Sequence, residues 1–320
     1  MKSITEIQNF EGKKVLVRVD WDVPFEDGVV VDGERVEASI PTIEYIKAHG
    51  GTPIVVGHFG RKGESIQPVI DFAKNNFPVF QNGVEFLENL RIDKREEENN
   101  ESFAKELASK ADIYVNDSFA TSHREHASIV GVPKLLPSYA GLQLTKEVEA
   151  LSKAFNPEHP FLFILGGAKL ETKLPLLKKF LDVADKVFVG GILAAEAYEN
   201  TEIKDNPKVM FPLGDIKALD VNQETLELLK LQVESSKFIL WNGPLGNYEN
   251  DYTFGTEGLA QILADAADKN GTQIIVGGGD TLAAIKKLCL VSHFTHLSLA
   301  GGAMLDFLVD GRLVGIDALG

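Results

Sequence analysis

The sequence of 320 residues has a single cysteine, Cys289, which excludes any disulfide framework within the chain. One thiol fits a reducing compartment, and because Cys289 stands in the apolar stretch LCLV, we expect it in the core. No apolar run is long enough to span a bilayer, and the N-terminal MKSITEIQNF lacks the apolar core of a signal peptide. We therefore expect a cytoplasmic protein without a membrane partner.

Positive charge is also scarce. The chain has 32 Lys and Arg against 47 Asp and Glu, and the resulting net charge of −15 argues against a general nucleic-acid binder. Clusters of Arg and His are informative against this acidic background. The length exceeds the usual size of one hydrophobic core, so we expect two domains. We further expect a monomer whose partners are small molecules.

Two common nucleotide motifs are missing. The sequence has no G-x-x-x-x-G-K-[ST], which excludes a P-loop NTPase. It has no G-x-G-x-x-G after a strand, which weakens the case for a nucleotide-dependent dehydrogenase. A nucleotide site in this chain must therefore use another pattern.

The first half alternates short apolar strands with helical stretches, which favours βαβ units and a parallel sheet. The strand candidates are 15–20, 53–58, 84–89 and 112–117, and helical spacing marks 40–48 and 101–111. A hairpin is expected at 27–31, and the acidic stretch 93–101 is expected to be a solvated loop. The amphipathic stretch 143–155 would then be the helix that joins the two domains.

Charged side chains follow each strand candidate of this half. They are Asp20, Asp22, His58, Arg61, Arg91 and the run His123–His126 with Arg124, and Arg35 after the hairpin could join them. A single Arg is usually a surface residue. Several cations at the carboxyl ends of parallel strands, where ligands bind, predict a cavity for a small, multiply anionic ligand.

The second half contains a strand with glycines and lysines after it. Phe161–Leu165 is a continuous apolar run, as expected of a strand buried on both faces, and Gly166 and Gly167 end it. Lys169 and Lys173 follow at i and i+4 of an expected helix. This arrangement can bind phosphate through N–H groups and lysines. The alternative is an ordinary βα turn with two solvated lysines.

The same pattern of strand and glycines recurs at 161–167, 186–191, 273–279 and 296–302, which predicts a nucleotide site. Asp280 follows the third repeat, where it could hold Mg²⁺ or simply cap a helix. The strand candidate 237–240 leads into an expected loop at 241–246, and Glu249 is either a ribose acceptor or a plain surface carboxylate. The predicted fold class is α/β, with two doubly wound parallel-sheet domains.

The chain resembles the phosphoglycerate kinase family along nearly its whole length. The matching pieces, in the family's order, are VLVRVDWDVP, ERVEASIPTI, GHFGR, FLENLR, VNDSFATSHREHAS, LGGAKLETK, WNGPLGNYE, VGGGDT and AGGAMLDFL. The resemblance implies reversible, Mg²⁺-dependent phosphoryl transfer between 1,3-bisphosphoglycerate and ADP, giving 3-phosphoglycerate and ATP in glycolysis. It also implies hinge closure between a triose-binding domain at 1–142 and a nucleotide-binding domain at 156–310, with the tail 311–320 packed on the first.

The resemblance assigns site residues as follows. The triose would bind Asp20, Asp22, Arg35, His58, Arg61, Arg91 and Arg124. The nucleotide would bind Gly167, Lys169, Lys173, Gly190, Gly191, Asn242, Pro244, Glu249, Gly277, Gly278, Gly279, Asp280 and Thr281, with Mg²⁺ on Asp280. The transferring group would meet Arg35, Lys173 and the helix starts at Gly278 and Gly301.

This chain also departs from the family. It has Asp22 where the family usually has Asn, and Leu299 and Ala300 replace a Thr-Gly pair. It is shorter between Gly63 and Val84 and again between Gly191 and Gly214, where the family builds part of its adenine pocket. These departures keep open an alternative function, that of a weakly active or non-catalytic phosphotriose-binding remnant.

Overall fold

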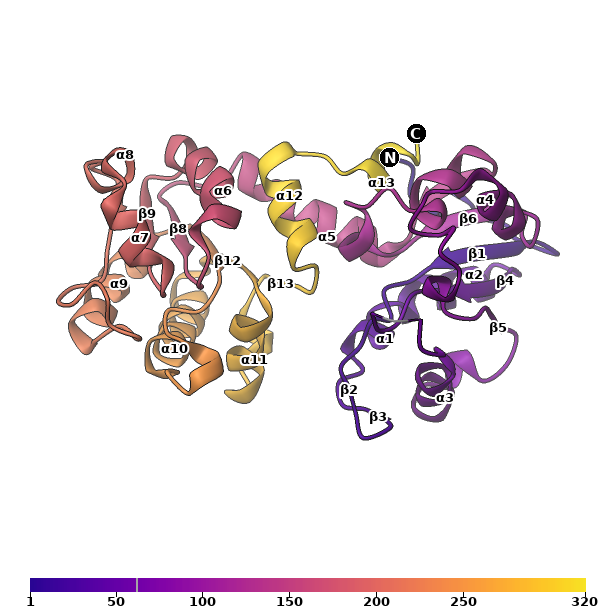
Figure 1. Ribbon diagram of the computed structural model, residues 1–320, viewed down its shortest axis with the longest axis horizontal. Helices are drawn as coiled ribbons and strands as arrows, with labels where there is room; N and C mark the ends of the chain where they lie inside the picture. The colour runs from indigo at the N-terminus through magenta and orange to yellow at the C-terminus, as the bar shows by residue number, and fades with distance from the viewer. Residues whose placement is uncertain (62) are drawn as a thin grey trace. The chain divides into compact units, whose positions relative to one another are not determined.

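The computed structural model describes residues 1–61 and 63–320 and divides into two compact units (Figure 1). Unit 1 consists of Met1–Glu149 with Arg312–Gly320, and unit 2 of Ala150–Gly311. Helix α5 (Leu142–Ser152) contains the point of division between the units. Each unit has its own parallel sheet covered by helices, which confirms the predicted two-domain α/β class.

The sheet of unit 1 has the strand order β5-β4-β1-β6-β7, and every neighbouring pair is parallel. Its strands are β1 (Lys14–Arg18), β4 (Thr52–Val56), β5 (Glu85–Phe86), β6 (Ile113–Asn116) and β7 (Ser138–Ala140). The expected hairpin is present as β2 (Phe25–Glu26) and β3 (Val29–Val30). From β1 the chain adds β4 and β5 on one side of β1, and then β6 and β7 on the other side. In such sheets ligands bind at the switch point, where this reversal occurs.

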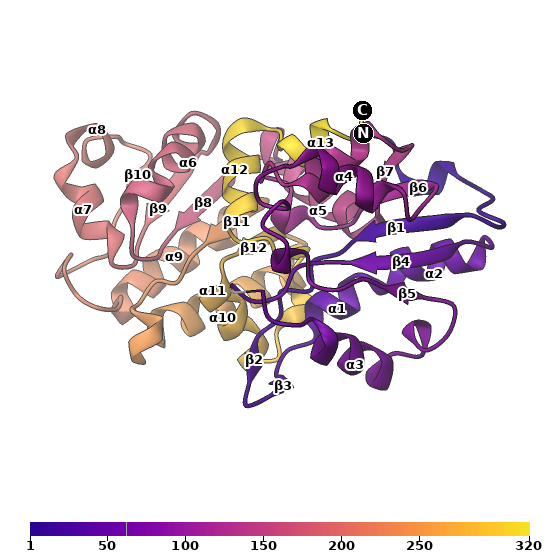
Figure 2. The same ribbon diagram turned by 45° about the vertical axis from the view of Figure 1, so that its right-hand side comes forward.

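Helices cover both faces of this sheet (Figure 2). They are α1 (Glu34–Ala38), α2 (Ile40–Ala48), α3 (Gln67–Asn76), α4 (Glu101–Ala108) and α13 (Val314–Asp317). Alternate β1 residues Val15 and Val17 pack with Ile43 of α2 and Val69 of α3 in one apolar core. The C-terminal helix α13 is attached to unit 1, since the N–H of Gly315 donates to the carbonyl of Ser122 at 2.8 Å.

The sheet of unit 2 has the order β10-β9-β8-β11-β12-β13, again with parallel neighbours. Its strands are β8 (Phe161–Leu165), β9 (Lys186–Val189), β10 (Val209–Met210), β11 (Phe238–Asn242), β12 (Gln273–Gly277) and β13 (His296–Ser298). Every residue of β8 and β11 is buried, as the continuous apolar run of β8 predicts. The switch point lies between these two strands.

Helices α9 to α11 lie on one side of this sheet and α6 on the other (Figures 1 and 2). The helices are α6 (Leu170–Val183), α7 (Leu193–Glu199), α8 (Thr201–Lys204), α9 (Gln223–Ser235), α10 (Phe254–Asn270), α11 (Gly279–Lys287) and α12 (Gly302–Asp310). Side chains of β8 alternate between the two cores. Ile164 packs in the core that includes Leu229 of α9, and Phe163 stacks on Phe180 of α6, with ring centroids 4.9 Å apart.

Two local expectations are wrong. Strand β11 runs through Trp241 and Asn242, which were expected in the following loop, because both pair in register with β12 and β8. Cys289 is exposed rather than in the core. It follows the end of α11 with a left-handed φ of 57°, which turns the chain after the helix.

Among the described residues, no helix combines the length and the apolar composition needed to cross a membrane.

The packing of α9 gives a matched test of the core. Leu229 is fully buried and Leu231, two residues along the same helix, is 64% exposed. We expect Leu229→Ala to lower the free energy of unfolding by about 2–5 kcal/mol, because it removes buried methyl groups and leaves a cavity. Leu231→Ala should change it by no more than about 0.5 kcal/mol. Urea denaturation of both variants makes the comparison, and equal losses would contradict the packing of α9.

Candidate functional site

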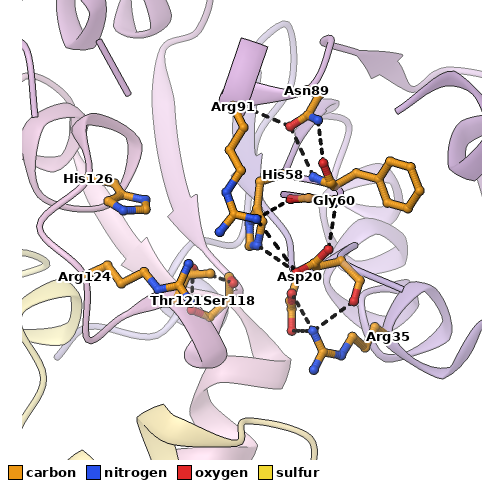
Figure 3. Close-up of polar contacts among 12 residues, drawn as sticks. Asp20, Arg35, His58, Gly60, Asn89, Arg91, Ser118, Thr121, Arg124 and His126 are labelled. Atoms are coloured by element: carbon orange, nitrogen blue, oxygen red, sulfur yellow. Dashed lines mark hydrogen bonds and ion pairs between the residues drawn. The ribbon is translucent and has the colours of Figure 1, made fainter. Parts of the chain in front are cut away.

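The residues after β1 and β4 meet in one hydrogen-bonded group in unit 1 (Figure 3). The guanidinium of Arg35, from α1, lies 3.0 Å from the carboxylate of Asp20 and donates to the backbone carbonyl of Asp22 at 3.1 Å. Parallel pairing of β1 and β4 places the two strand ends side by side. Asp20, Asp22, Arg35 and His58 therefore lie together, as the sequence predicts.

The carboxylate of Asp22 lies close to several hydrogen-bond donors. Its carboxylate accepts the N–H of Gly60 at 2.9 Å, with His58 Nε2 at 3.3 Å and Arg91 Nη1 at 4.0 Å. Burial alone would raise the pKa of Asp22, but the hydrogen bond from His58, the positive charge of that ring when it is protonated, the hydrogen bond from Gly60 and the charge of Arg91 outweigh it and lower this pKa. Asp22 is therefore ionised at every ordinary working pH.

Asn89, which the sequence did not single out, positions the segment after β4. Its buried amide caps the 3-10 turn Leu90–Ile92, accepts from the N–H of Phe59 at 3.1 Å and donates to the carbonyl of Phe59 at 2.6 Å. Arg91 then donates to the carbonyl of Gly60 and contacts Glu97 at 3.3 Å. Arg61, on the same segment, is exposed.

Arg124 follows β6 and belongs to a separate set of contacts. It is half-buried, and its Nε lies 3.4 Å from Nε2 of His123. Figure 3 shows it beside Ser118 and Thr121, whose hydroxyls are 2.7 Å apart. Burial, together with the charges of Arg18, Arg124 and other neighbours, lowers the pKa of His126 to about 4, so this imidazole is neutral at pH 7.

Glu96 corrects the expectation of a solvated loop at 93–101. It is 1% exposed and accepts both the N–H and the hydroxyl of Ser128, at 2.9 and 2.5 Å. Ser128 in turn accepts from Nε of Arg18, whose side chain is fully buried. A charge inside the apolar strand sequence VLVRVD is the one signal that could have revealed this network.

The glycines of unit 2 allow the backbone after β8 and the backbone after β11 to touch. The N–H of Gly167 donates to the carbonyl of Pro244 at 2.8 Å, and a Cβ on Gly166 would lie 2.2 Å from that same carbonyl oxygen. Gly243 has φ of 91°, and a Cβ there would lie 2.5 Å from the carbonyl oxygen of Gly166. Side chains are therefore excluded at positions 166 and 243, on the two turns that meet at the switch point of this sheet.

Lys173 and Lys169 have different surroundings. Nζ of Lys173 donates to the carbonyl of Gly166 at 2.7 Å, and burial lowers its pKa to about 8 although the carboxylate of Asp280 opposes the shift. Lys169 is exposed and precedes α6 in extended backbone, with φ of −120° and ψ of 105°. The expectation that both lysines stack on one helix face is therefore wrong, because the helix begins one residue after Lys169.

Four helices of unit 2 begin close to the ends of its strands, namely α6, α7, α11 and α12. The structure describes all four in full, and none of them has a side chain hydrogen-bonded to its first N–H groups. The Oγ1 of Thr281, in the first turn of α11, is buried without a hydrogen-bond partner among the described residues. The first N–H of α7, that of Leu193, donates to the carbonyl of Gly167 at 3.0 Å, so the open helix starts are those of α6, α11 and α12. Open N–H groups together with an unused hydroxyl can bind an anion.

The remaining predicted residues lie at or after the carboxyl ends of strands of the same sheet. Gly190 follows β9 and donates to the carbonyl of Leu165 at 2.8 Å, and Gly191 has φ of 69°. Asn242 and Pro244 are buried, whereas Glu249 is exposed. Gly277 is the last residue of β12, and Gly278, with φ of 104°, precedes α11. Gly279 and Asp280 are the first two residues of α11. Gly301, with φ of 54°, precedes α12. Asp280 is not the N-cap, since Gly278 occupies that position.

Metal binding from the protein alone would need several ligands together. Among the described residues there is no group of three or more His, Cys, Asp or Glu side chains placed to hold a metal ion. Asp280 supplies one half-buried carboxylate at the start of α11. That is the donor set expected when the phosphates of a nucleotide provide the other ligands of Mg²⁺.

Comparison with known proteins gives the family. A family model described as phosphoglycerate kinase matches residues 4–77, 71–206 and 195–311. The chain belongs to the phosphoglycerate kinase family. Phosphoglycerate kinases of Finegoldia magna and Dictyoglomus turgidum are each 34% identical, over 97% and 98% of this chain and 97% and 96% of their own length.

Solved structures agree with this assignment. A phosphoglycerate kinase from Coxiella burnetii is 30% identical, with a TM-score of 0.86 over 99% of this chain and 98% of its own. The alignment with the Finegoldia magna protein runs over 387 positions, 67 more than the 320 residues of this chain, which is thus a shortened member of the family.

The glycine at position 243 can be tested against a second glycine with positive φ. Gly271 has φ of 65° but no atom of the described chain within 4 Å of a Cβ built there. We expect Gly271→Ala to cost about 1–2 kcal/mol of unfolding free energy from backbone strain alone. Gly243→Ala should cost about 1–3 kcal/mol more, because its Cβ overlaps the carbonyl oxygen of Gly166. Denaturant unfolding measures both, and equal costs would contradict the close approach of the two turns.

Proposed function

We propose that this chain catalyses reversible, Mg²⁺-dependent phosphoryl transfer between 1,3-bisphosphoglycerate and ADP, giving 3-phosphoglycerate and ATP. Unit 1 would bind the triose and unit 2 the nucleotide. The observation that carries the proposal is the division of anion-binding groups between the units. One has fixed guanidinium and imidazole groups, and the other has open helix N-termini with a half-buried lysine.

The group in unit 1 suits a small phosphorylated acid. Arg35, Arg91 and Arg124 supply planar guanidinium donors, which match carboxylate and phosphate oxygens. Asp20 holds Arg35 and retains acceptor capacity for a substrate hydroxyl. We infer that His58, Asp22 and Arg61 complete this triose site.

The groups in unit 2 suit a nucleotide with its metal. The first N–H groups of α6, α11 and α12, the glycines after the strands and the hydroxyl of Thr281 would hold the phosphates, and Lys173 would neutralise them. Asn242, Pro244 and Glu249 would lie near the base and ribose. Asp280 would hold Mg²⁺, which when bound offsets the negative charge of the phosphate oxygens.

The chemistry requires positioning and charge rather than a general base. The accepting carboxylate of 3-phosphoglycerate, with a pKa near ~4, is already ionised at pH 7. Arg35 from the triose side and Lys173 from the nucleotide side would stabilise the charge that spreads over the transferring phosphoryl oxygens, aided by the helix starts at Gly278 and Gly301. Because each unit holds one of the reactants, the reaction requires the two bound ligands to meet.

The proposal is tested by assaying product formation from 3-phosphoglycerate and ATP, with the acyl phosphate consumed by a coupling dehydrogenase. We expect turnover with Mg²⁺, its loss when the metal is chelated and its return when Mg²⁺ is restored. Calorimetric binding of 3-phosphoglycerate without turnover would instead support a non-catalytic remnant, the alternative that the substitutions at Leu299 and Ala300 keep open. If the protein shows neither binding nor turnover, both proposed functions are refuted.

Arg35 should matter for turnover more than for nucleotide binding. We expect Arg35→Ala to lower kcat by roughly 10²–10³-fold, because a donor to the transition-state charge is lost, while the Kd for ATP changes little. Arg95→Ala is the matched control. Arg95 is also in unit 1 but pairs with Asp93 and Glu106 on the surface, so kcat should be kept. A kcat for Arg35→Ala equal to that of the control would remove Arg35 from the mechanism.

The pKa of Lys173 predicts a descending limb in the pH profile of kcat/KM for ATP. The ammonium is charged below its pKa of about 8 and neutral above it, so kcat/KM for ATP should fall as pH rises through that value. Saturating ATP should move the fall in kcat to higher pH, since phosphates stabilise the charged form. Lys173→Met should abolish the limb together with most activity, and Lys169→Met, at the exposed lysine, should keep it. A limb that persists in Lys173→Met would belong to another group.

A further inference from the structure

The structure assigns to Arg18 a positioning role: it holds His58 as a neutral imidazole protonated on Nε2, so that this histidine serves the triose site as a fixed hydrogen-bond donor. The inference deepens the proposed function and rests on it for the identity of the ligand. Nη2 of Arg18 lies 2.9 Å from Nδ1 of His58, and both side chains are at least 95% buried, with exposed fractions of 0% and 5%.

The tautomer follows from the direction of the hydrogen bonds. A guanidinium can only donate, so Nδ1 of His58 must accept with its lone pair. The proton of the neutral ring is then on Nε2, which faces the carboxylate of Asp22 at 3.3 Å. A second proton on Nδ1 would set two donors against each other inside the protein, and His58 therefore stays neutral while Arg18 keeps this contact.

The other donor groups of Arg18 are hydrogen-bonded too, and these bonds fix its side chain. It donates through Nε to the hydroxyl of Ser128 at 3.1 Å and through Nη1 to the carbonyl of Val19. Because that hydroxyl accepts from Arg18, its own proton goes to Glu96 at 2.5 Å. Burial raises the pKa of Glu96, whereas the charge of Arg18 and the hydrogen bonds from Ser128 lower it, so Glu96 and Arg18 each favour the charged form of the other.

The charges around His58 act in both directions. Burial and the cations Arg18 and Arg91 lower the pKa of His58, whereas Asp22 and Asp20 raise it, and the balance lies on the lower side. The neighbouring imidazole of His126 is neutral at pH 7, since its own pKa is about 4. Geometry and surroundings agree that His58 carries no charge at pH 7.

The same direction of bonding explains why a carboxylate suits position 22 in this chain. One oxygen of Asp22 accepts from Gly60 and the other faces the Nε2–H of His58. An asparagine, which the family usually has at this position, has only one acceptor oxygen. If that oxygen bonded Gly60, its amide N–H₂ would face another donor. Asp22 is therefore the acceptor matched to the His58 tautomer that Arg18 imposes.

The test is the protonation of the His58 ring in the full-length protein, followed by ¹⁵N-edited NMR of histidine-labelled samples. His58→Gln identifies the resonances. We expect Nδ1 to be unprotonated and Nε2 protonated at pH 7, with any titration below the ordinary histidine value of about 6.5. A ring protonated on Nδ1, or one that titrates near that value, overturns the inference, and this spectrum of the unchanged protein needs no variant.

Variants of Arg18 then test the cause. Arg18→Lys keeps a donor and should keep the tautomer, whereas Arg18→Met removes it and should raise the pKa of His58 towards the ordinary value of about 6.5, although burial still lowers it. Arg95→Met, at the surface of the same unit, should leave the spectrum unchanged. An unaltered tautomer and titration in folded Arg18→Met would show that Arg18 is not the cause.

Adding 3-phosphoglycerate separates this inference from the proposed function. We expect the Nε2 resonance of His58 to shift with the ligand. If the tautomer is as stated but the ligand has no effect on any resonance of unit 1, the proposed triose site fails and the role of Arg18 stands. If the ligand binds but Nδ1 is protonated, the role of Arg18 fails and the triose site stands.

Discussion

Parallel strand pairing is the constraint on which both candidate sites depend. It brings the carboxyl ends of all strands of a sheet to one edge, so residues far apart in the sequence are gathered without further contacts between them. In unit 1 this collects Asp20, His58 and Arg91 after β1, β4 and β5. In unit 2 it brings the turn after β8 so close to the turn after β11 that only glycine fits at 166 and 243. The composition of the sites thus follows from the pairing of the sheets.

The parts of the fold with a local signature could be predicted from the sequence. Phe161–Leu165 is buried on both faces, and a continuous apolar run shows this directly. The burial of Glu96 could not be predicted, because its acidic surroundings indicate solvent while its partner Ser128 lies 32 residues further along the chain. Asn89 likewise acts on Phe59, 30 residues away. Lys169 was misplaced for a smaller reason, since the start of a helix is uncertain by a residue or two from sequence alone.

Arg18, which is fully buried, and Lys173, which is half-buried, differ in how completely the protein satisfies them. Arg18 has acceptors in Ser128, the carbonyl of Val19 and His58, with Glu96 behind them. Among the described residues, Lys173 has a single acceptor, the carbonyl of Gly166, and its pKa falls to about 8. A buried ammonium with little compensation is unfavourable until an anion approaches. We therefore regard Arg18 as part of the framework and Lys173 as the group that gains most from a phosphate.

The glycines at the starts of α11 and α12 bear on the choice between an enzyme and a remnant. Among the described residues, nothing outside the adjoining chain lies within 4 Å of a Cβ built on Gly279, Gly301 or Gly302. Packing of the fold therefore does not exclude a side chain there, unlike at Gly166. Each glycine nevertheless carries a cost in conformational entropy on folding. Open space in front of uncapped N–H groups is useful when a ligand occupies it, which favours a phosphate-binding role for these helix starts over a purely structural one.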